Sequence, residues 1–176
     1  MSAFPYQGYA GQYLRVNLTS GTISKLPLPL EWVENYLGGN GIGTRILWDE
    51  VPPEVDPLSP ENKLIVATGP LCGGPMPNSG RLEFIAKSPL TGMYGDANAG
   101  GHFGPELKYA GYDLIIFEGK APEPVYLWVK DGVAELRSAA GLWGKGVFET
   151  EVKLKSLAKD PELKVAAIGP AGENLV

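Results

Sequence analysis

Two polar, glycine-bearing segments hold the residues best suited to chemistry. Asn78-Ser79-Gly80-Arg81 is a polar turn that delivers an arginine at the start of an apolar stretch, and Asn98-Ala99-Gly100-Gly101 directly precedes an expected helix over residues 102–110. The first turn of a helix carries unpaired backbone N–H groups and a partial positive charge. Glycines in front of it let an anion approach the backbone closely. These residues predict a site for a phosphate-bearing ligand.

Arg81 is the side chain that would strengthen such a site. A guanidinium presents a planar pair of N–H donors that matches a phosphate. The alternative is that the glycines around residue 100 only let the chain turn tightly before the helix. Taken alone, these residues leave both interpretations open.

Other kinds of reactive site find little support. The chain has one histidine, His102, and one cysteine, Cys72, so it has no C-x-x-C pair and no metal-ligand cluster. An iron–sulfur cluster needs about four thiolates, which this chain lacks. Cys72 is expected to be a small buried residue. Asp96 and Asp113 are candidate carboxylates without a partner in the sequence, so we assign no catalytic residue.

Charge and hydropathy exclude two classes of partner. Acidic residues outnumber basic ones, 20 to 15, for a net charge of −5, and the basic residues form no stripe. We therefore expect neither nucleic acid nor an anionic membrane surface as a partner. No apolar run approaches the roughly 18–20 residues of a membrane span, and no signal peptide is visible. A cytoplasmic location is expected.

The elements that must position the two segments are short. The chain has 24 glycines and 16 prolines, which indicates many turns. Alternating or apolar runs predict strands over residues 13–18, 22–26, 63–68, 82–87, 112–119, 125–129, 133–137 and 164–168. Helical patterns predict helices over residues 30–37, 40–49, 102–110 and 147–158, with Asn40 capping the second.

The two halves of the chain repeat in order. Residues 13–16 with a turn at Gly21 are similar to residues 126–129 with a turn at Gly132, and residues 64–70 are similar to 165–170. This order predicts an α+β fold: a duplicated unit of mostly antiparallel sheets with a few short helices, related by a pseudo-twofold. A Rossmann fold is disfavoured, because no G-x-G-x-x-G leads from a strand into a helix.

Six segments carry a resemblance that spans nearly the whole chain in colinear order. The sequence resembles the N-terminal domain of aldehyde ferredoxin oxidoreductases, a family that includes tungsten enzymes and the related benzoyl-CoA reductase catalytic subunit. The segments are Arg15-Val16-Asn17-Leu18, Asp56-Pro57-Leu58-Ser59-Pro60-Glu61-Asn62-Lys63-Leu64, Lys87-Ser88-Pro89-Leu90-Thr91-Gly92, Ala97-Asn98-Ala99-Gly100-Gly101-His102-Phe103-Gly104, Glu106-Leu107-Lys108-Tyr109-Ala110-Gly111-Tyr112-Asp113 and Ile168-Gly169-Pro170-Ala171-Gly172-Glu173-Asn174.

The resemblance implies a base on which a tungsten bis-pterin (molybdopterin-type) cofactor sits. Arg81 matches an arginine that contacts the pterin phosphates. Asn98 matches a residue whose backbone carbonyl helps to hold a magnesium ion that bridges those phosphates. Ala99, Gly100 and Gly101 match the turn that lies against the pterin. The cofactor contacts implied by the family thus fall on the anion site expected from the residues alone.

The resemblance also implies that residues 1–176 are only the pterin-cradling domain of a larger enzyme. The complete enzyme would oxidise an aldehyde to a carboxylic acid and pass electrons through a 4Fe-4S cluster to ferredoxin or to an iron–sulfur electron-transfer subunit. The cluster cysteines and acid/base residues belong to the remaining domains, which this chain lacks. We therefore predict that the isolated chain is inactive, and that the complete enzyme is a homodimer or a larger complex. One departure is that residues 37–41 lack the arginine usual near Asn40.

Two alternatives stay open. Asp49, residues 51–55 and residues 71–73 resemble the benzoyl-CoA reductase branch, whose reaction is the low-potential reduction of an aromatic thioester. The other alternative is a non-catalytic cofactor-binding or scaffold module. The sequence decides neither the aldehyde nor the choice between tungsten and molybdenum.

Overall fold

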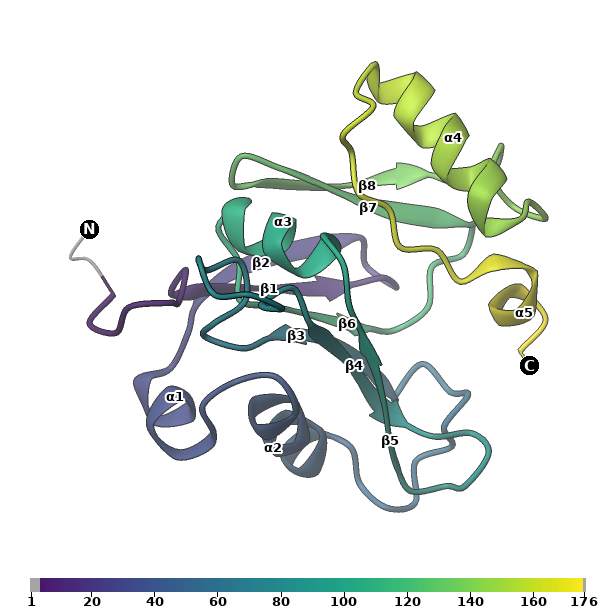
Figure 1. Ribbon diagram of the computed structural model, residues 1–176. Coiled ribbons are helices and arrows are strands. Elements are labelled where there is room, and N and C mark those ends of the chain that lie inside the picture. The colour runs from purple at the N-terminus through teal and green to yellow at the C-terminus, as the bar shows by residue number, and fades with distance from the viewer. Residues whose placement is uncertain (1–3, 176) are drawn as a thin grey trace.

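The computed structural model describes residues 4–175 as a mixed α+β domain (Figure 1). Its strands are β1 (Gln12–Asn17), β2 (Thr22–Pro27), β3 (Lys63–Thr68), β4 (Leu82–Lys87), β5 (Tyr94–Ala99), β6 (Leu114–Glu118), β7 (Val125–Lys130) and β8 (Val133–Ser138). Its helices are α1 (Leu30–Tyr36), α2 (Asn40–Glu50), α3 (Phe103–Tyr109), α4 (Val147–Ala158) and α5 (Gly169–Glu173). None of these helices is long and apolar enough to cross a membrane.

A six-stranded sheet in the order β2-β1-β6-β3-β4-β5 forms the centre of the domain. Its strands pair antiparallel except β1 and β6, which are parallel. Helices α1 and α2 cover one face, and α3 lies on the other (Figure 1). The predicted α+β class with mostly antiparallel sheets is confirmed.

The central strands are apolar because both faces of the sheet are covered. In β3, Ile65 and Ala67 belong to the core under α1 and α2, whereas Val66 points into the core under α3. In β6, Leu114 and Ile116 join the first core and Ile115 joins the second. Side chains alternate across a strand, so a strand buried on both faces reads as a continuous apolar run.

The second half of the chain forms a smaller layer. The hairpin β7–β8 lies beyond α3, and α4 lies beyond the hairpin (Figure 1). The hairpin packs on the α3 core through Leu127, Val129 and Leu136. Leu142 and Leu154 form a separate small cluster beside α4. Both halves of the chain therefore have a hairpin followed by a helix: β1–β2 and then α1, and β7–β8 and then α4.

The predicted strand over residues 164–168 is wrong. A strand needs a neighbour that accepts and donates its backbone hydrogen bonds, and β7 and β8 pair only with each other within the part of the chain that the structure describes. Gly169, the residue after that range, begins α5. The second half thus lacks the strand that follows the helices in the first half, and the pseudo-twofold stays a prediction.

Two local predictions near the site also differ from the structure. Asn40 is the first residue of α2, and the N-cap is Gly39, with φ at +49° and no side-chain capping bond. Strand β5 was not predicted at all, because its residues, Tyr-Gly-Asp-Ala-Asn-Ala, show no apolar alternation. It is an edge strand, held by its pairing with β4.

Candidate functional site

The pairing of β4 with β5 brings the two predicted segments together. Leu82 lies opposite Ala99, and Glu83 lies opposite Asn98. Arg81 immediately precedes β4, and Gly100 immediately follows β5. Segments separated by about 20 positions in the sequence therefore meet at one end of the hairpin.

A close backbone approach fixes this meeting. A Cβ atom added at Gly80 would lie 2.3 Å from the carbonyl oxygen of Gly101, which is closer than real Cβ atoms come to any atom. Only glycine leaves room for these two segments of the backbone to touch there. The glycine before Arg81 is thus required by packing, and it holds the turn before β4 against the loop after β5.

The loop after β5 is open to solvent. A Cβ atom at Gly100 or Gly101 would meet no heavy atom within 4 Å, and Gly101 has φ at +101°. Arg81, Asn98, Gly100 and Gly101 are exposed, and Ala99 is half-buried. The five predicted site residues therefore share one accessible surface.

A short relay of hydrogen bonds joins the side chains at this surface. Arg81 Nη1 donates to Asn98 Oδ1, and Asn98 Nδ2 donates to Glu83 Oε1. Because arginine only donates and a carboxylate only accepts, the relay allows one orientation of the Asn98 amide. Arg81 forms no ion pair with any residue between 4 and 175, so its charge is available to an anion.

Glu83 is the member of this cluster that sequence reasoning missed. Its Oε2 atom is buried and has no hydrogen-bond partner. Its Cγ atom lies 3.6 Å from the Cβ position of Gly39, the N-cap of α2. The only signal in the sequence was a carboxylate within the apolar run Leu82–Lys87.

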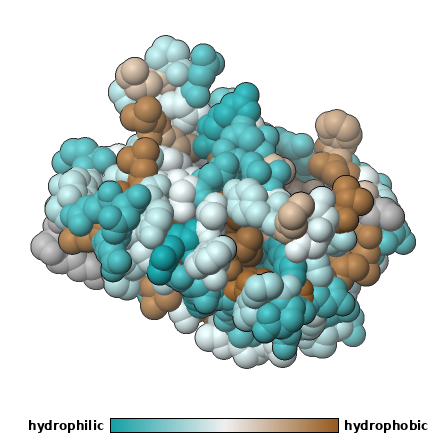
Figure 2. Space-filling model, turned by 90° about the horizontal axis from the view of Figure 1, so that it is seen from below, coloured by the Kyte–Doolittle hydropathy of each residue, from teal (hydrophilic) through white to brown (hydrophobic). Residues whose placement is uncertain are grey.

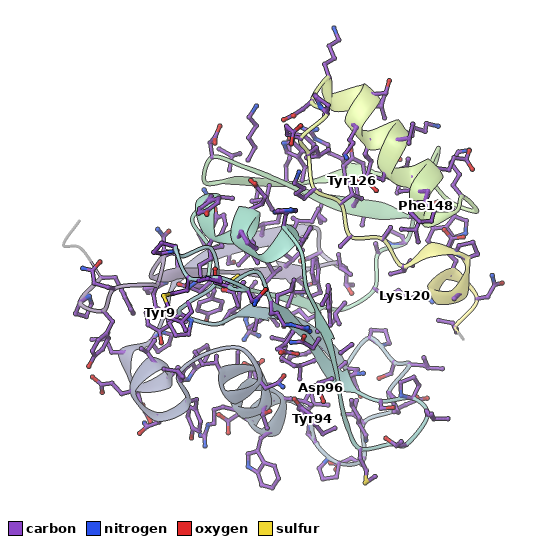
Figure 3. All side chains as sticks on the ribbon, in the orientation of Figure 1. Tyr9, Tyr94, Asp96, Lys120, Tyr126 and Phe148 are labelled. Carbon is purple, nitrogen blue, oxygen red and sulfur yellow. The ribbon has the colours of Figure 1, made fainter. Side chains whose placement is uncertain are left out.

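The polar cluster extends to the first turn of α2. Asn40 Nδ2 donates to Asp96 Oδ2 over 3.4 Å. Figure 3 shows Asp96 and Tyr94 of β5 on the side of the hairpin that faces α2. Seen from the side of α1 and α2, the surface is mostly polar with scattered apolar groups (Figure 2). Residues 37–41 thus adjoin the site, which their sequence alone did not show.

The helix that follows the loop agrees with prediction to within one residue at each end. Helix α3 spans Phe103–Tyr109, and exposed His102 is its N-cap without a side-chain capping bond. At its other end Gly111 has φ at +97°, and its N–H donates to Lys108 O over 2.9 Å, as a terminating glycine does. Gly100 and Gly101 therefore connect the end of β5 to the start of α3.

The other candidate groups, Asp113 and Cys72, are buried and contact other parts of the fold. The buried carboxylate of Asp113 accepts from the N–H groups of Ala10 and Gly11 and pairs with Lys108 over 2.6 Å. Burial raises the pKa of the Cys72 thiol, and the charge of Lys108 offsets only part of this effect. Residues 4–175 contain no cluster of three or more acidic, histidine or cysteine side chains that could hold a metal ion.

A large hollow lies elsewhere in the domain. A mainly apolar cavity of about 960 Å³ separates the sheet and α3 from β7, β8 and the chain after α4. Leu64, Phe84, Phe103 and Leu127 are among its lining residues, whereas Arg81 and the residues from 98 to 101 are not. The site at the end of the β4–β5 hairpin therefore lies outside this cavity.

Comparison with known proteins gives this surface a context. The sequence profile of the family described as "Aldehyde ferredoxin oxidoreductase, N-terminal domain" matches residues 13–176. Two similar curated proteins, both named tungsten-containing aldehyde ferredoxin oxidoreductase, come from Pyrococcus abyssi, at 54% identity, and Pyrococcus furiosus, at 50%. Each alignment covers 169 residues, which is 96% of this chain and 28% of the relative.

A solved structure is similar in both sequence and fold. It is the active-site complex BamBC of benzoyl coenzyme A reductase bound to 1,5-dienoyl-CoA, with a TM-score of 0.94 and 48% identity. The match covers 96% of this chain and 26% of that chain. The chain thus spans little more than a quarter of the length of the proteins it matches.

Proposed function

The chain belongs to the family of the aldehyde ferredoxin oxidoreductase N-terminal domain, and from that premise we propose that it is the cofactor-binding domain of a tungsten bis-pterin, iron–sulfur oxidoreductase. The complete enzyme converts aldehydes to carboxylic acids with ferredoxin as the electron acceptor. Its 4Fe-4S cluster is held by the remaining domains. A cytoplasmic location, an alternative iron–sulfur electron-transfer subunit as partner, and assembly into a homodimer or larger complex are parts of the same proposal.

One observation carries the proposal. The guanidinium of Arg81 has only the neutral Asn98 oxygen as its partner among the described residues, and the neighbouring Gly80 touches the exposed loop at Gly101. An unneutralised cation next to accessible N–H groups binds phosphate. We assign Arg81 to the phosphates of the pterin, and the segment from Ala99 to Gly101 to the surface against which the pterin lies.

Asn98 suits the magnesium ion that we propose between those phosphates. It lies in β5, whose outer side pairs with no strand in the described residues, so this edge has main-chain groups without ladder partners. Magnesium prefers oxygen ligands and keeps several waters, so it needs few groups from the protein. The backbone carbonyl of Asn98 is the ligand we assign.

The residues of this chain bind and orient the cofactor. When bound, the tungsten centre supplies the two-electron oxidation of the substrate, with water as the oxygen source. Arg81 binds the negatively charged phosphates of the cofactor, and the Asn98 amide fixes the Arg81 side chain. The glycines let the ligand approach the main chain. No side chain here is assigned a proton-transfer role, so we expect the isolated chain to show no aldehyde oxidation.

The test uses the complete gene product, purified without oxygen. Tungsten is measured by elemental analysis, the pterin by its fluorescence after oxidation, and aldehyde oxidation with a viologen dye as the acceptor. We expect tungsten, pterin and activity together. A protein without tungsten or pterin would contradict the proposal. A protein that carries the cofactor but neither oxidises aldehydes nor reduces an aromatic thioester would favour a cofactor-binding or scaffold module.

A second candidate function is the reduction of an aromatic thioester. The observation that favours it is the 48% identity to the benzoyl coenzyme A reductase complex over nearly the whole chain. The identity of 54% to an aldehyde oxidoreductase favours the first candidate. Assays of the same loaded protein with aldehydes and with benzoyl-CoA at low potential distinguish the two.

A further inference from the structure

The second carboxylate oxygen of Glu83 has no partner in the folded chain. Glu83 Oε2 is buried, and it is the one buried side-chain polar atom in residues 4–175 that lacks a hydrogen bond. Leaving such an atom unsatisfied is costly, most of all when the group is charged. A buried acceptor of this kind therefore calls for a donor from outside the chain.

The groups around Glu83 do not supply that donor. Asn98 Nδ2 donates to the other oxygen, Oε1. The nearby start of α2 favours a negative charge through its dipole. Two of the N–H groups at this start have other partners: Gly39 N donates to Thr68 O over 3.0 Å, and Gly41 N donates to Gly38 O over 3.0 Å. The Oε2 atom of Glu83 remains unpaired.

The position of Glu83 relates it to the cation of the site. Arg81 and Glu83 are two positions apart, a spacing of about 6.6 Å along an extended chain, and the Asn98 side chain joins them. A cation that suits a phosphate and a carboxylate that repels one are therefore held side by side. A single ligand that contacts both must be anionic at one end and carry N–H donors at the other.

A pterin phosphate has this chemistry, since its ring carries an exocyclic amino group and ring N–H groups. Resting on the function proposed above, we propose that Glu83 Oε2 accepts a hydrogen bond from an N–H group of the bound pterin ring. Glu83 then sets which ring is accepted, and it also holds the amide of Asn98 in the orientation that fixes Arg81.

Substitution by glutamine separates this role from a change of shape. In Glu83→Gln, one of the two acceptor positions becomes a donor, whichever way the amide turns. It then opposes either the Asn98 amide or the ring N–H. A hydrogen bond to a charged group corresponds to a change of about 10- to 100-fold in affinity. Glu123→Gln is the matched control, because Glu123 is exposed and makes no hydrogen bond or ion pair within residues 4–175.

The experiment follows the release of pterin from the loaded, complete gene product during gel filtration and dialysis, with fluorescence of the oxidised pterin as the readout. Unfolding midpoints of the cofactor-depleted proteins are measured alongside. We expect Glu83→Gln to release pterin about 10 to 100 times faster than wild type. Glu123→Gln should match wild type in both release rate and unfolding midpoint, and depleted Glu83→Gln should still show a cooperative unfolding transition.

The outcomes are distinct. Release from Glu83→Gln at the wild-type rate overturns the inference and leaves the proposed function standing. If Glu83→Gln does not fold, Glu83→Ala is measured in the same way; failure of both to fold would show that Glu83 supports the fold and would also overturn the inference. A wild-type protein that holds no pterin refutes the proposed function itself.

Discussion

Replacing Gly80 by alanine should disrupt the site from beneath. The added Cβ atom would lie 2.3 Å from the carbonyl oxygen of Gly101, whereas real Cβ contacts stay at 3.0 Å or more. The difference, 3.0 minus 2.3, means that the backbone segments at Gly80 and Gly101 must separate by at least about 0.7 Å. The obstructing atom belongs to the backbone, so no side-chain rotation relieves the contact.

The size of the effect follows from comparable overpacking. Forcing an extra carbon into a packed contact costs about 1–3 kcal/mol. We expect Gly80→Ala to lower the free energy of unfolding by that amount, measured by urea titration of the complete gene product. The shift also displaces Gly101 relative to Arg81, so the variant should retain less tungsten and pterin after purification than wild type.

Gly100→Ala is the matched control for this prediction. A Cβ atom there meets nothing within 4 Å, so its unfolding free energy should stay within about 1 kcal/mol of wild type. If Gly80→Ala and Gly100→Ala have the same unfolding free energy, the close approach of Gly80 to Gly101 does not hold the two segments together.

Three further predictions concern charge and burial. Asp113→Ala should lower the free energy of unfolding by about 3–5 kcal/mol, because it leaves the buried Lys108 ammonium without its carboxylate; a loss below 1 kcal/mol would contradict this. Burial raises the pKa of Glu50, but its hydrogen bond to Arg15 and the nearby positive charges outweigh burial and leave the pKa below 4.5. The stabilisation by Glu50 is therefore present above pH 4.5 and lost as the pH falls through the lowered pKa, so Glu50→Gln should show a shallower acid decline in unfolding titrations. Because burial raises the pKa of Cys72, iodoacetamide should modify the folded protein at least about tenfold more slowly than the urea-unfolded protein, and equal rates would disprove the burial.

The sequence predicted those parts of the fold that have a local pattern. The runs at Lys63–Thr68 and Leu114–Glu118 are apolar because both faces of the sheet are covered, and both were predicted as strands. Strand β5 has small, polar, exposed side chains, and only its pairing with β4 defines it. Residues 164–168 show the converse, since an apolar run without a neighbouring strand forms no strand.

The candidate site divides in the same way. Arg81 and residues 98–101 were predicted from residue types and from the resemblance, and the structure places them together on one surface. Glu83 was missed because its contact with Asn98 depends on the register of β4 against β5. That register is a long-range property, which spacing along the chain does not reveal. Likewise, the approach of Gly80 to Gly101 appears only after the hairpin has formed.

The most direct test of the account is a crystal structure of the complete gene product with its cofactor bound. We expect a pterin phosphate oxygen within about 2.7–2.9 Å of the Arg81 guanidinium. We also expect a magnesium ion about 2.1 Å from the backbone carbonyl of Asn98. A cofactor bound away from Arg81 and the Asn98–Gly101 loop, for example over the apolar cavity beneath β7 and β8, would contradict the account.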